Sequence, residues 1–194
     1  MAVDFGAPAT AVKSPSKLAH VVLRTNNFGP MVQFYETFLG ARVIYENGML
    51  AFLSYDDEHH RIAIVQVPGT QAKNPKSCGL EHIAFTFDSL SDLLLAYRQR
   101  KQKDILPIWP VNHGPTTSIY YRDPDGNEIE TQVDNFEDAE EATVFMTSKA
   151  FAENPIGVDF DPEDMIARLE RGESEKSLQK RAEIGPRGLP DHMR

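Results

Sequence analysis

Hydrophobic and polar residues alternate in two stretches of the chain that open in the same way. Segments 18–24 and 80–87 both begin Leu-x-His and continue with β-branched or aromatic residues, a composition typical of strands. In the second stretch Ile83 and Phe85 lie on an apolar row, and His82 lies on the opposite, more polar row. We therefore expect each strand to pack one face in the core and to present its histidine on the other.

A segment with apolar residues at helical spacing follows each of these strands. The first predicted helix begins after Asn26 or Asn27 and ends at Gly40, a residue typical of helix C-caps. Its apolar positions are Met31, Phe34, Tyr35, Phe38 and Leu39. The second predicted helix is capped by Asp88 or Ser89. Its apolar positions are Leu90, Leu93, Leu94 and Tyr97.

Further strands complete each half of the chain. They are predicted at 41–45, 49–55 and 60–67 in the first half, and within the Pro-rich 105–110, at 116–122 and at 126–133 in the second. Asn47-Gly48 and Asp123-Pro124-Asp125-Gly126 mark hairpin turns. The order β-α-β-β-β thus occurs twice. The sequence predicts an α+β fold of two tandem βαβββ modules, residues 18–67 and 80–135, that form a curved mixed sheet around a metal cleft.

The two ends of the chain differ in composition from these modules. Residues 1–17 have no apolar run and are expected to form a loose leader, and residues 137–194 form an acidic and polar extension. Asp161 as N-cap and Pro162 at the first helical position predict a helix in this extension, and the tail beyond Gly172 is expected to pack loosely. A solvated extension, a lid and a subunit contact remain alternatives for it.

Composition narrows the classes of partner and location. The 194 residues carry a formal net charge of −9 without a basic block, which argues against a nucleic-acid partner. No segment approaches the roughly 20 apolar residues of a membrane helix, so no membrane span is expected. Cys78 is the single cysteine and cannot form an internal disulfide, which favours a reducing, cytoplasmic location.

Three residues match the ligand set of a non-haem metal centre. His20 and His82 hold the same place in the two opening strands, and Glu130 lies on the last strand, where it opposes apolar Ile129. Two imidazoles and one carboxylate on one face of a divalent ion leave positions open for substrate and oxygen, an arrangement typical of Fe(II). A lone strand histidine is more often a partly buried residue than a ligand. The repeated placement favours the ligand interpretation here.

Three further residues have two open interpretations each. His60 follows His59, and alternation turns one of the two inward, where a histidine suits proton transfer near neutral pH; both are otherwise exposed at a loop end. His113 lies in a loop flanked by Gly and Pro, and Tyr120 lies in the following strand. Tyr120 taken alone is a half-buried sheet residue.

The motif around the last hairpin resembles a known family. The spacing His113-x5-Ile119-Tyr120-x2-Asp123-Pro124-Asp125-Gly126-x3-Glu130 fits, without a break, the signature of type I extradiol ring-cleavage dioxygenases. These belong to the vicinal oxygen chelate (glyoxalase/bleomycin-resistance) superfamily, and the resemblance covers about residues 18–136. Many family members carry two such domains in tandem, so this chain resembles a single-domain form.

The resemblance implies a function and a role for each candidate residue. His20, His82 and Glu130 would bind Fe(II), or Mn(II), which accepts the same ligands. His60 would handle protons, and His113 and Tyr120 would hydrogen-bond the hydroxyl groups of a catechol that reacts with O2. A homo-oligomer, a dimer or larger, is expected. The aromatic residues Phe52, Trp109 and Tyr121 line the pocket or lie in the core.

Other activities occur on the same fold. A non-oxygenase metalloenzyme, such as a glyoxalase-like isomerase or lyase, would often add a fourth protein ligand on the last strand of the first module, where Gln66 is the polar residue. A protein that merely binds an aromatic compound would not need His60 beside a complete set of metal ligands. The dioxygenase is therefore the leading hypothesis.

Overall fold

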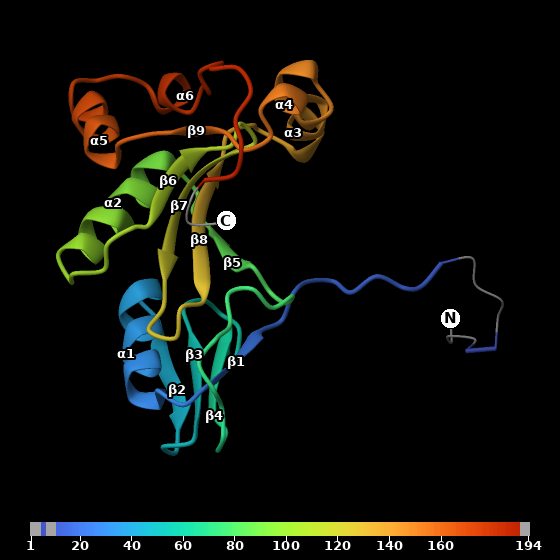
Figure 1. Cartoon of the computed structure of the whole chain (residues 1–194), viewed down its shortest axis with the longest axis vertical. Coiled ribbons are helices and arrows are strands. Elements are labelled where there is room, and N and C mark those ends of the chain that lie inside the picture. The colour runs from blue at the N-terminus through green and yellow to red at the C-terminus, as the bar shows by residue number, and fades with distance from the viewer. Residues whose placement is uncertain (1–4, 7–10, 191–194) are drawn as a thin grey trace.

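Two sheets, each with a helix on one face, form the framework of the chain (Figure 1). The computed structural model describes residues 5–6 and 11–190, so the predicted leader, 1–17, lies partly outside the described residues. The element order β-α-β-β-β occurs twice, as predicted, and the α+β class is confirmed. The strands do not join into one curved sheet, because residues 67–81 between the modules form no strand and the two sheets share no hydrogen-bonded pair.

The first module contains a four-stranded sheet with the order β1-β4-β3-β2. Its elements are β1 (Val21–Thr25), α1 (Phe28–Leu39), β2 (Arg42–Glu46), β3 (Leu50–Ser54) and β4 (Ile62–Gln66). Strand β1 is parallel to β4, and the other neighbours are antiparallel. Helix α1 ends at Gly40 in the left-handed conformation, as predicted. Asn27 occupies the N-cap position but makes no side-chain cap bond; the Thr25 hydroxyl accepts from its backbone N–H instead.

The second module contains a five-stranded sheet with the order β5-β8-β7-β6-β9. Its elements are β5 (His82–Thr86), α2 (Leu90–Lys101), β6 (Trp109–Asn112), β7 (Thr116–Arg122), β8 (Glu128–Asp134) and, from the C-terminal extension, β9 (Val158–Asp159). Ser89 caps α2 by accepting from the Asp92 backbone N–H, one of the two predicted choices. The short strand expected within 105–110 is β6, which begins at Trp109 and runs two residues beyond that range while it pairs with β7.

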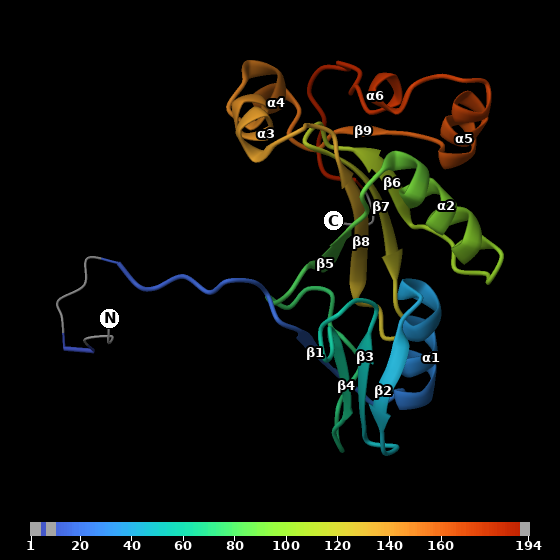
Figure 2. The ribbon, with the colours of Figure 1, turned by 180° about the vertical axis from the view of Figure 1, so that it is seen from behind.

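The C-terminal extension packs against the end of the second sheet (Figure 2). It contains α3 (Ala139–Met146), α4 (Lys149–Glu153), α5 (Pro162–Glu170) and α6 (Glu175–Leu178). The Asp161 side chain caps α5 with Pro162 in its first turn, as predicted. The prediction of a loose tail after Gly172 is wrong for its first part, because Leu178 and Arg181 are buried. Among residues 5–6 and 11–190, no helix has the length and apolar character that a bilayer span requires.

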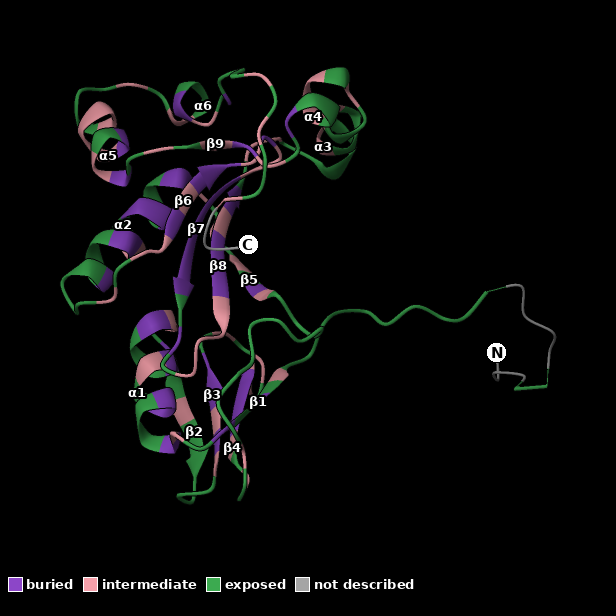
Figure 3. Cartoon of the chain, viewed as in Figure 1, coloured by how far each residue is buried: buried purple, intermediate pink, exposed green. Residues whose placement is uncertain are grey.

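One hydrophobic core connects the two modules. The Phe38 ring of α1 meets the Tyr121 ring of β7 with centroids 5.0 Å apart. Arg100 of α2 donates from Nε to the Phe38 carbonyl at 2.9 Å, and its guanidinium lies 4.0 Å above the Phe38 ring. Tyr121 is therefore a core residue rather than a pocket residue. Figure 3 shows β7 buried along most of its length and β2 largely exposed.

A buried hydrogen bond also joins the modules. The Tyr35 hydroxyl of α1 donates to Asp123 Oδ2 at 3.0 Å, and Asp123 Oδ1 accepts from the backbone N–H groups of Asp125 and Asn127 in the β7–β8 turn. This turn is completed by Gly126, whose positive φ of 81° suits glycine. The Tyr35 side chain, from the first module, thus supports the β7–β8 turn, which precedes Glu130.

Replacing Tyr35 by phenylalanine is expected to lower the free energy of unfolding by about 1–2 kcal/mol, because the buried Asp123 Oδ2 loses one of its two donors and keeps only the Asn127 side-chain amide. Urea denaturation measures the change. Tyr45→Phe is the matched control, since that hydroxyl contacts an exposed Asn47 side chain. Equal stabilities for the two variants would contradict the buried contact.

Candidate active site

The second sheet presents a row of functional side chains on the face away from α2. The strand register aligns neighbouring residues of β5, β8, β7 and β6 in the order Ala84, Glu130, Tyr120 and Trp109. His82 lies two residues before Ala84 and shares its face. Ile83 and Ile129, on the opposite face, are buried in the core. His82 and Glu130 therefore lie on the sheet face that was predicted for them.

His82 and Glu130 contact each other directly. The distance from His82 Nε2 to Glu130 Oε2 is 3.0 Å, and Glu130 is only 5% exposed. The hydrogen bond that His82 donates to the Glu130 carboxylate raises the pKa of His82 above its ordinary value. Burial alone would raise the pKa of Glu130, but contacts with His82 and Ser118 outweigh it and hold that pKa below its usual range. The pair is an ionised carboxylate facing an imidazole.

His113 and Tyr120 form a second contact beside this pair. His113 Nδ1 lies 2.5 Å from the Ile156 carbonyl, which only accepts, so Nδ1 carries the proton. Burial lowers the pKa of His113, which favours the neutral ring and leaves Nε2 as the acceptor of the Tyr120 hydroxyl at 3.1 Å. Burial, and then the charge of Glu130, raise the pKa of Tyr120, so its phenol stays protonated. His113 and Tyr120 therefore form a hydrogen-bonded polar pair at a fixed position in the site.

Residues of the C-terminal extension hold this part of the site in place, and sequence reasoning did not find them. Strand β9 pairs with β6, and Asp159 accepts from Trp109 Nε1 at 2.7 Å. Arg187 binds both carboxylate oxygens of Asp159 and donates to the Gly157 carbonyl. The Trp109 ring stacks on Tyr120 with centroids 5.1 Å apart. The extension therefore orients His113 through Ile156 and supports Tyr120 through Trp109.

The other two predicted residues, His20 and His60, lie together on the first sheet. Their ring centroids are 4.3 Å apart, and the His60 ring lies 4.6 Å from that of Phe52. Arg61 Nη1 donates to the carbonyls of residues 18 and 19 and so fixes the segment before His20. His59 is exposed, as expected for the outward member of its pair. Partial burial first, and then the neighbouring His20 and His59 rings, lower the pKa of His60.

The chain alone does not assemble the complete predicted metal site. The structure brings His82 and Glu130 together and places His20 with His60. Within the described residues, no group of three His, Cys, Asp or Glu side chains has the spacing to hold a metal ion. Within one chain, only two of the three predicted metal ligands, His82 and Glu130, therefore lie together.

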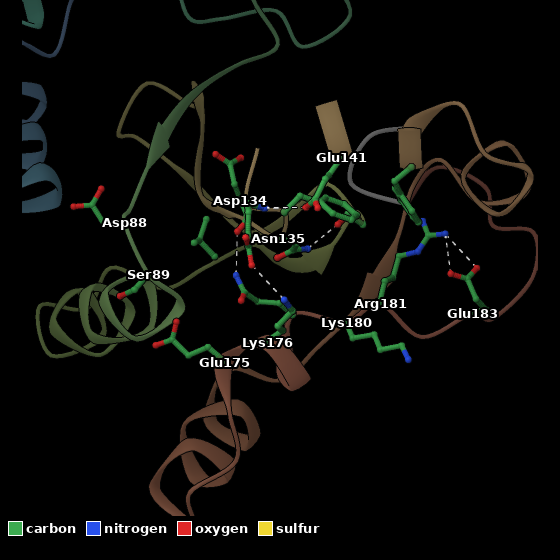
Figure 4. Close-up of a pocket in the computed structure, with 16 residues that line it drawn as sticks. Asp88, Ser89, Asp134, Asn135, Glu141, Glu175, Lys176, Lys180, Arg181 and Glu183 are labelled. Atoms are coloured by element: carbon green, nitrogen blue, oxygen red, sulfur yellow. Dashed lines mark hydrogen bonds and ion pairs between the residues drawn. The ribbon is translucent and has the colours of Figure 1, made fainter. Parts of the chain in front are cut away.

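A separate hollow lies between the second sheet and the C-terminal extension (Figure 4). Its volume is about 600 Å³, and its walls include Asp134, Asn135, Glu175 and Arg181. Arg181 points to Glu183, with which it forms an ion pair at 3.2 Å. None of the six predicted site residues lines this hollow.

Comparison with known proteins identifies the family. A model described as the Glyoxalase/Bleomycin resistance protein/Dioxygenase superfamily matches residues 17–131, more than half of the chain. The chain belongs to this superfamily. The prediction made from the His113–Glu130 motif is confirmed at the level of the family.

Two curated relatives of this superfamily chain come from Rhodococcus globerulus. The chain is 48% identical to biphenyl-2,3-diol 1,2-dioxygenase 2 over 75% of its own length and 77% of that protein. It is 45% identical to biphenyl-2,3-diol 1,2-dioxygenase 3 over 86% of its own length and 88% of that protein. The second alignment is long enough to include part of the C-terminal extension or leader, which the family model does not cover.

Solved structures of the superfamily share the fold at much lower identity. A glyoxylase/bleomycin resistance protein/dioxygenase domain from Frankia sp. EAN1pec has a TM-score of 0.54 at 16% identity and covers 66% of this chain and 98% of that one. Lactoylglutathione lyase from Agrobacterium tumefaciens has a TM-score of 0.51 at 20% identity and covers 62% and 96%. These likenesses show the fold alone.

Proposed function

We propose that this chain is an extradiol dioxygenase, which uses O2 to cleave a catecholic ring beside its two hydroxyl groups and gives a ring-opened semialdehyde acid. The observation that carries the proposal is the identity of 45–48% to two biphenyl-2,3-diol 1,2-dioxygenases, over most of the length of each. An aryl-substituted catechol is accordingly the first substrate to test.

The geometry of the second module supports this substrate class. The Tyr120 hydroxyl and the His113 ring lie 3.1 Å apart, and Tyr120 neighbours Glu130 in the sheet register. Neutral donor and acceptor groups at fixed positions suit the two adjacent hydroxyl groups of a catechol. Trp109, stacked on Tyr120, adds an aromatic surface beside them. His60 is proposed to accept a proton from one of the catechol hydroxyl groups.

Extradiol dioxygenases depend on a metal ion. We propose Fe(II), with Mn(II) as the alternative, because His and carboxylate ligands suit both ions. His82, Glu130 and His20 are the proposed ligands, although one chain does not bring His20 to the other two. The ion would supply oxygen chemistry that protein side chains lack.

The register of the first sheet argues against the isomerase or lyase alternative. His20 and Val22 correspond to His82 and Ala84, and Val22 pairs with Ala63 in the register in which Ala84 pairs with Glu130. Ala63 thus stands in the first module where Glu130 stands in the second, and it cannot bind a metal. Gln66, the polar residue of β4, lies three positions further on and is exposed. A fourth protein ligand from this strand is not supported.

An oxygen-electrode screen tests the proposed activity. Protein loaded anaerobically with Fe(II) is expected to consume O2 with at least one member of a panel of catechols, and an aryl-substituted diol is expected to be among the best. The ring-fission product is yellow, so its absorbance gives a second readout. No turnover across the panel by protein with bound iron would contradict the proposal.

Two further features of the proposal concern the cell and the assembly. The lone exposed Cys78 forms no disulfide and supports a reducing compartment, so we propose the cytoplasm as the location. We also propose a homo-oligomer, for which the separation of His20 from the other ligands provides the structural reason.

The variant Arg187→Met is expected to lower kcat/KM by about 10-fold, mainly through a higher KM, because β9 loses its anchor and the Ile156 carbonyl no longer fixes His113. Steady-state kinetics with an aryl catechol measure the effect. Arg171→Met, at the exposed C-cap of α5, is the matched control. Unchanged kinetics in Arg187→Met would show that the extension does not position His113.

A further inference from the structure

We propose that the hollow between the second sheet and the C-terminal extension is a second binding site, which takes an aromatic carboxylate. Its volume of about 600 Å³ is in the range of pockets that bind small molecules. Its walls come from the start of α2, the end of β8, α3 and the segment 175–183, which includes α6. None of the six predicted site residues lines it, so the inference goes beyond the proposed function and does not depend on it.

An unsatisfied guanidinium donor on the wall of the hollow is the first observation. The Arg181 side chain is only 2% exposed. Its Nη1 donates to the carbonyls of His113 and Asn154. Its Nη2 donates to the Ala150 carbonyl and to the carboxylate of Glu183. In the part of the chain that the structure describes, the buried Nε has no partner. A buried donor without an acceptor is unfavourable, so this atom marks a place for an acceptor from outside the chain.

The contact of Glu183 with this guanidinium indicates that the acceptor is a carboxylate. Nε and Nη2 lie on one edge of an arginine side chain, and a carboxylate that accepts from both makes a strong bidentate contact. Glu183 accepts from Nη2 alone, at 3.2 and 3.3 Å, and its side chain is 57% exposed. A ligand carboxylate that replaced Glu183 would accept from both donors of the edge. Glu183 would then turn to solvent, which its exposed position allows.

Two phenylalanine rings in the wall favour a ligand with an aromatic ring. Phe136 and Phe145 both line the hollow, and their ring centroids are 5.5 Å apart. The Arg181 guanidinium lies 5.0 Å from the Phe145 ring, so aromatic surface and positive charge meet in one place. Phe145 is held there by close packing against Gly114, where an added Cβ would collide with its ring. A ligand ring thus meets a fixed aromatic wall beside the group that binds its carboxylate.

The charges of the hollow are divided between its ends. Asp88 and Glu175 lie at one end, and Lys180 and Arg181 lie toward the other, as Figure 4 shows. Glu175 is already engaged, because it accepts from backbone N–H groups in the first turn of α2. Lys180 is exposed, and no ion pair of residues 5–6 and 11–190 includes it. The end with the two cations therefore suits an anionic group.

Isothermal titration calorimetry of the full chain tests the proposal, with benzoate and the larger 2-naphthoate as probes. At least one of them is expected to bind with one site per chain. Benzamide, which has the ring without the charge, and acetate, which has the charge without the ring, are expected to bind at least about 10-fold more weakly. Benzylamine tests the opposite charge and is expected not to bind.

Two substitutions with opposite expected effects locate the binding site. Glu183→Gln removes the competing carboxylate, so the aromatic carboxylate is expected to bind about 3-fold more tightly or better. Lys180→Gln removes a cation and is expected to weaken binding by about 3-fold. The matched control is Glu170→Gln, an equal change of charge at an exposed glutamate of α5 that does not line the hollow. It is expected to leave the affinity unchanged. Each changed side chain is exposed, so the variants are expected to fold.

Several results would overturn the proposal. If neither benzoate nor 2-naphthoate binds, the hollow is not a site for aromatic carboxylates. The same affinity in wild type, Glu183→Gln and Lys180→Gln would place the probe elsewhere on the chain. Tighter binding of benzylamine than of benzoate would assign the hollow to cationic aromatic compounds instead. None of these measurements uses ring cleavage, so their failure and the failure of the proposed function are separate outcomes.

Discussion

The Glu130→Ala variant is expected to lose its metal and its ring-cleavage activity together. Glu130 is the one carboxylate in the predicted ligand set, and it is buried against His82 at 3.0 Å. Loss of an outer partner of a metal ligand costs about 10–100-fold in affinity, so loss of a ligand is expected to exceed about 100-fold. Metal content after desalting and O2 uptake with an aryl catechol measure the two effects.

Asp134→Asn is the control for this change, because Asp134 ends the same strand and is exposed. It is expected to keep both metal and activity. Circular dichroism of both variants separates metal loss from unfolding. A folded Glu130→Ala protein that retains a full complement of iron would show that Glu130 is not a ligand.

The His60→Ala variant is expected to behave in the opposite way: it keeps its iron and loses rate. The His60 ring packs between the rings of His20 and Phe52. Its lowered pKa favours the neutral imidazole, which can accept a proton. Loss of a general base typically costs about 10²–10⁴-fold in kcat. Single-turnover kinetics with metal-loaded protein measure the change.

Asp57→Ala is the matched control, since Asp57 lies in the same loop and is exposed, whereas His59 contacts the His60 ring directly. It is expected to turn over at close to the wild-type rate. Full activity in His60→Ala would remove His60 from the mechanism, and loss of iron in that variant would make it a ligand instead of a proton acceptor.

Local pattern was enough to predict most of the elements and the face that each candidate residue uses. Alternation placed His82 and Glu130 opposite Ile83 and Ile129, and the structure has them so. The turn residues around Asp123 correctly located the last hairpin. These features depend on residues close in the chain or on side-chain periodicity, which the sequence displays directly.

Long-range contacts carried by the backbone could not be predicted in the same way. His113 contacts the backbone carbonyl of Ile156, 43 residues further along the chain, so the Ile156 side chain takes no part in the contact. Strand β9 has two residues, too few for a periodic signal, and Arg187 acts through its ion pair with Asp159. The arrangement of the two modules is likewise set by contacts such as Tyr35 with Asp123, 88 residues apart. The separation of His20 from His82 follows from that arrangement and is invisible in the local sequence.

Turnover under ¹⁸O₂ tests the central claim most directly. Wild-type protein loaded with Fe(II) is given an aryl catechol, and the ring-opened product is trapped before its carbonyl oxygen exchanges with water and is analysed by mass spectrometry. An extradiol dioxygenase places both oxygen atoms of one O2 molecule in the product. A product without labelled oxygen, or a substrate that is isomerised while no O2 is consumed, would contradict the account.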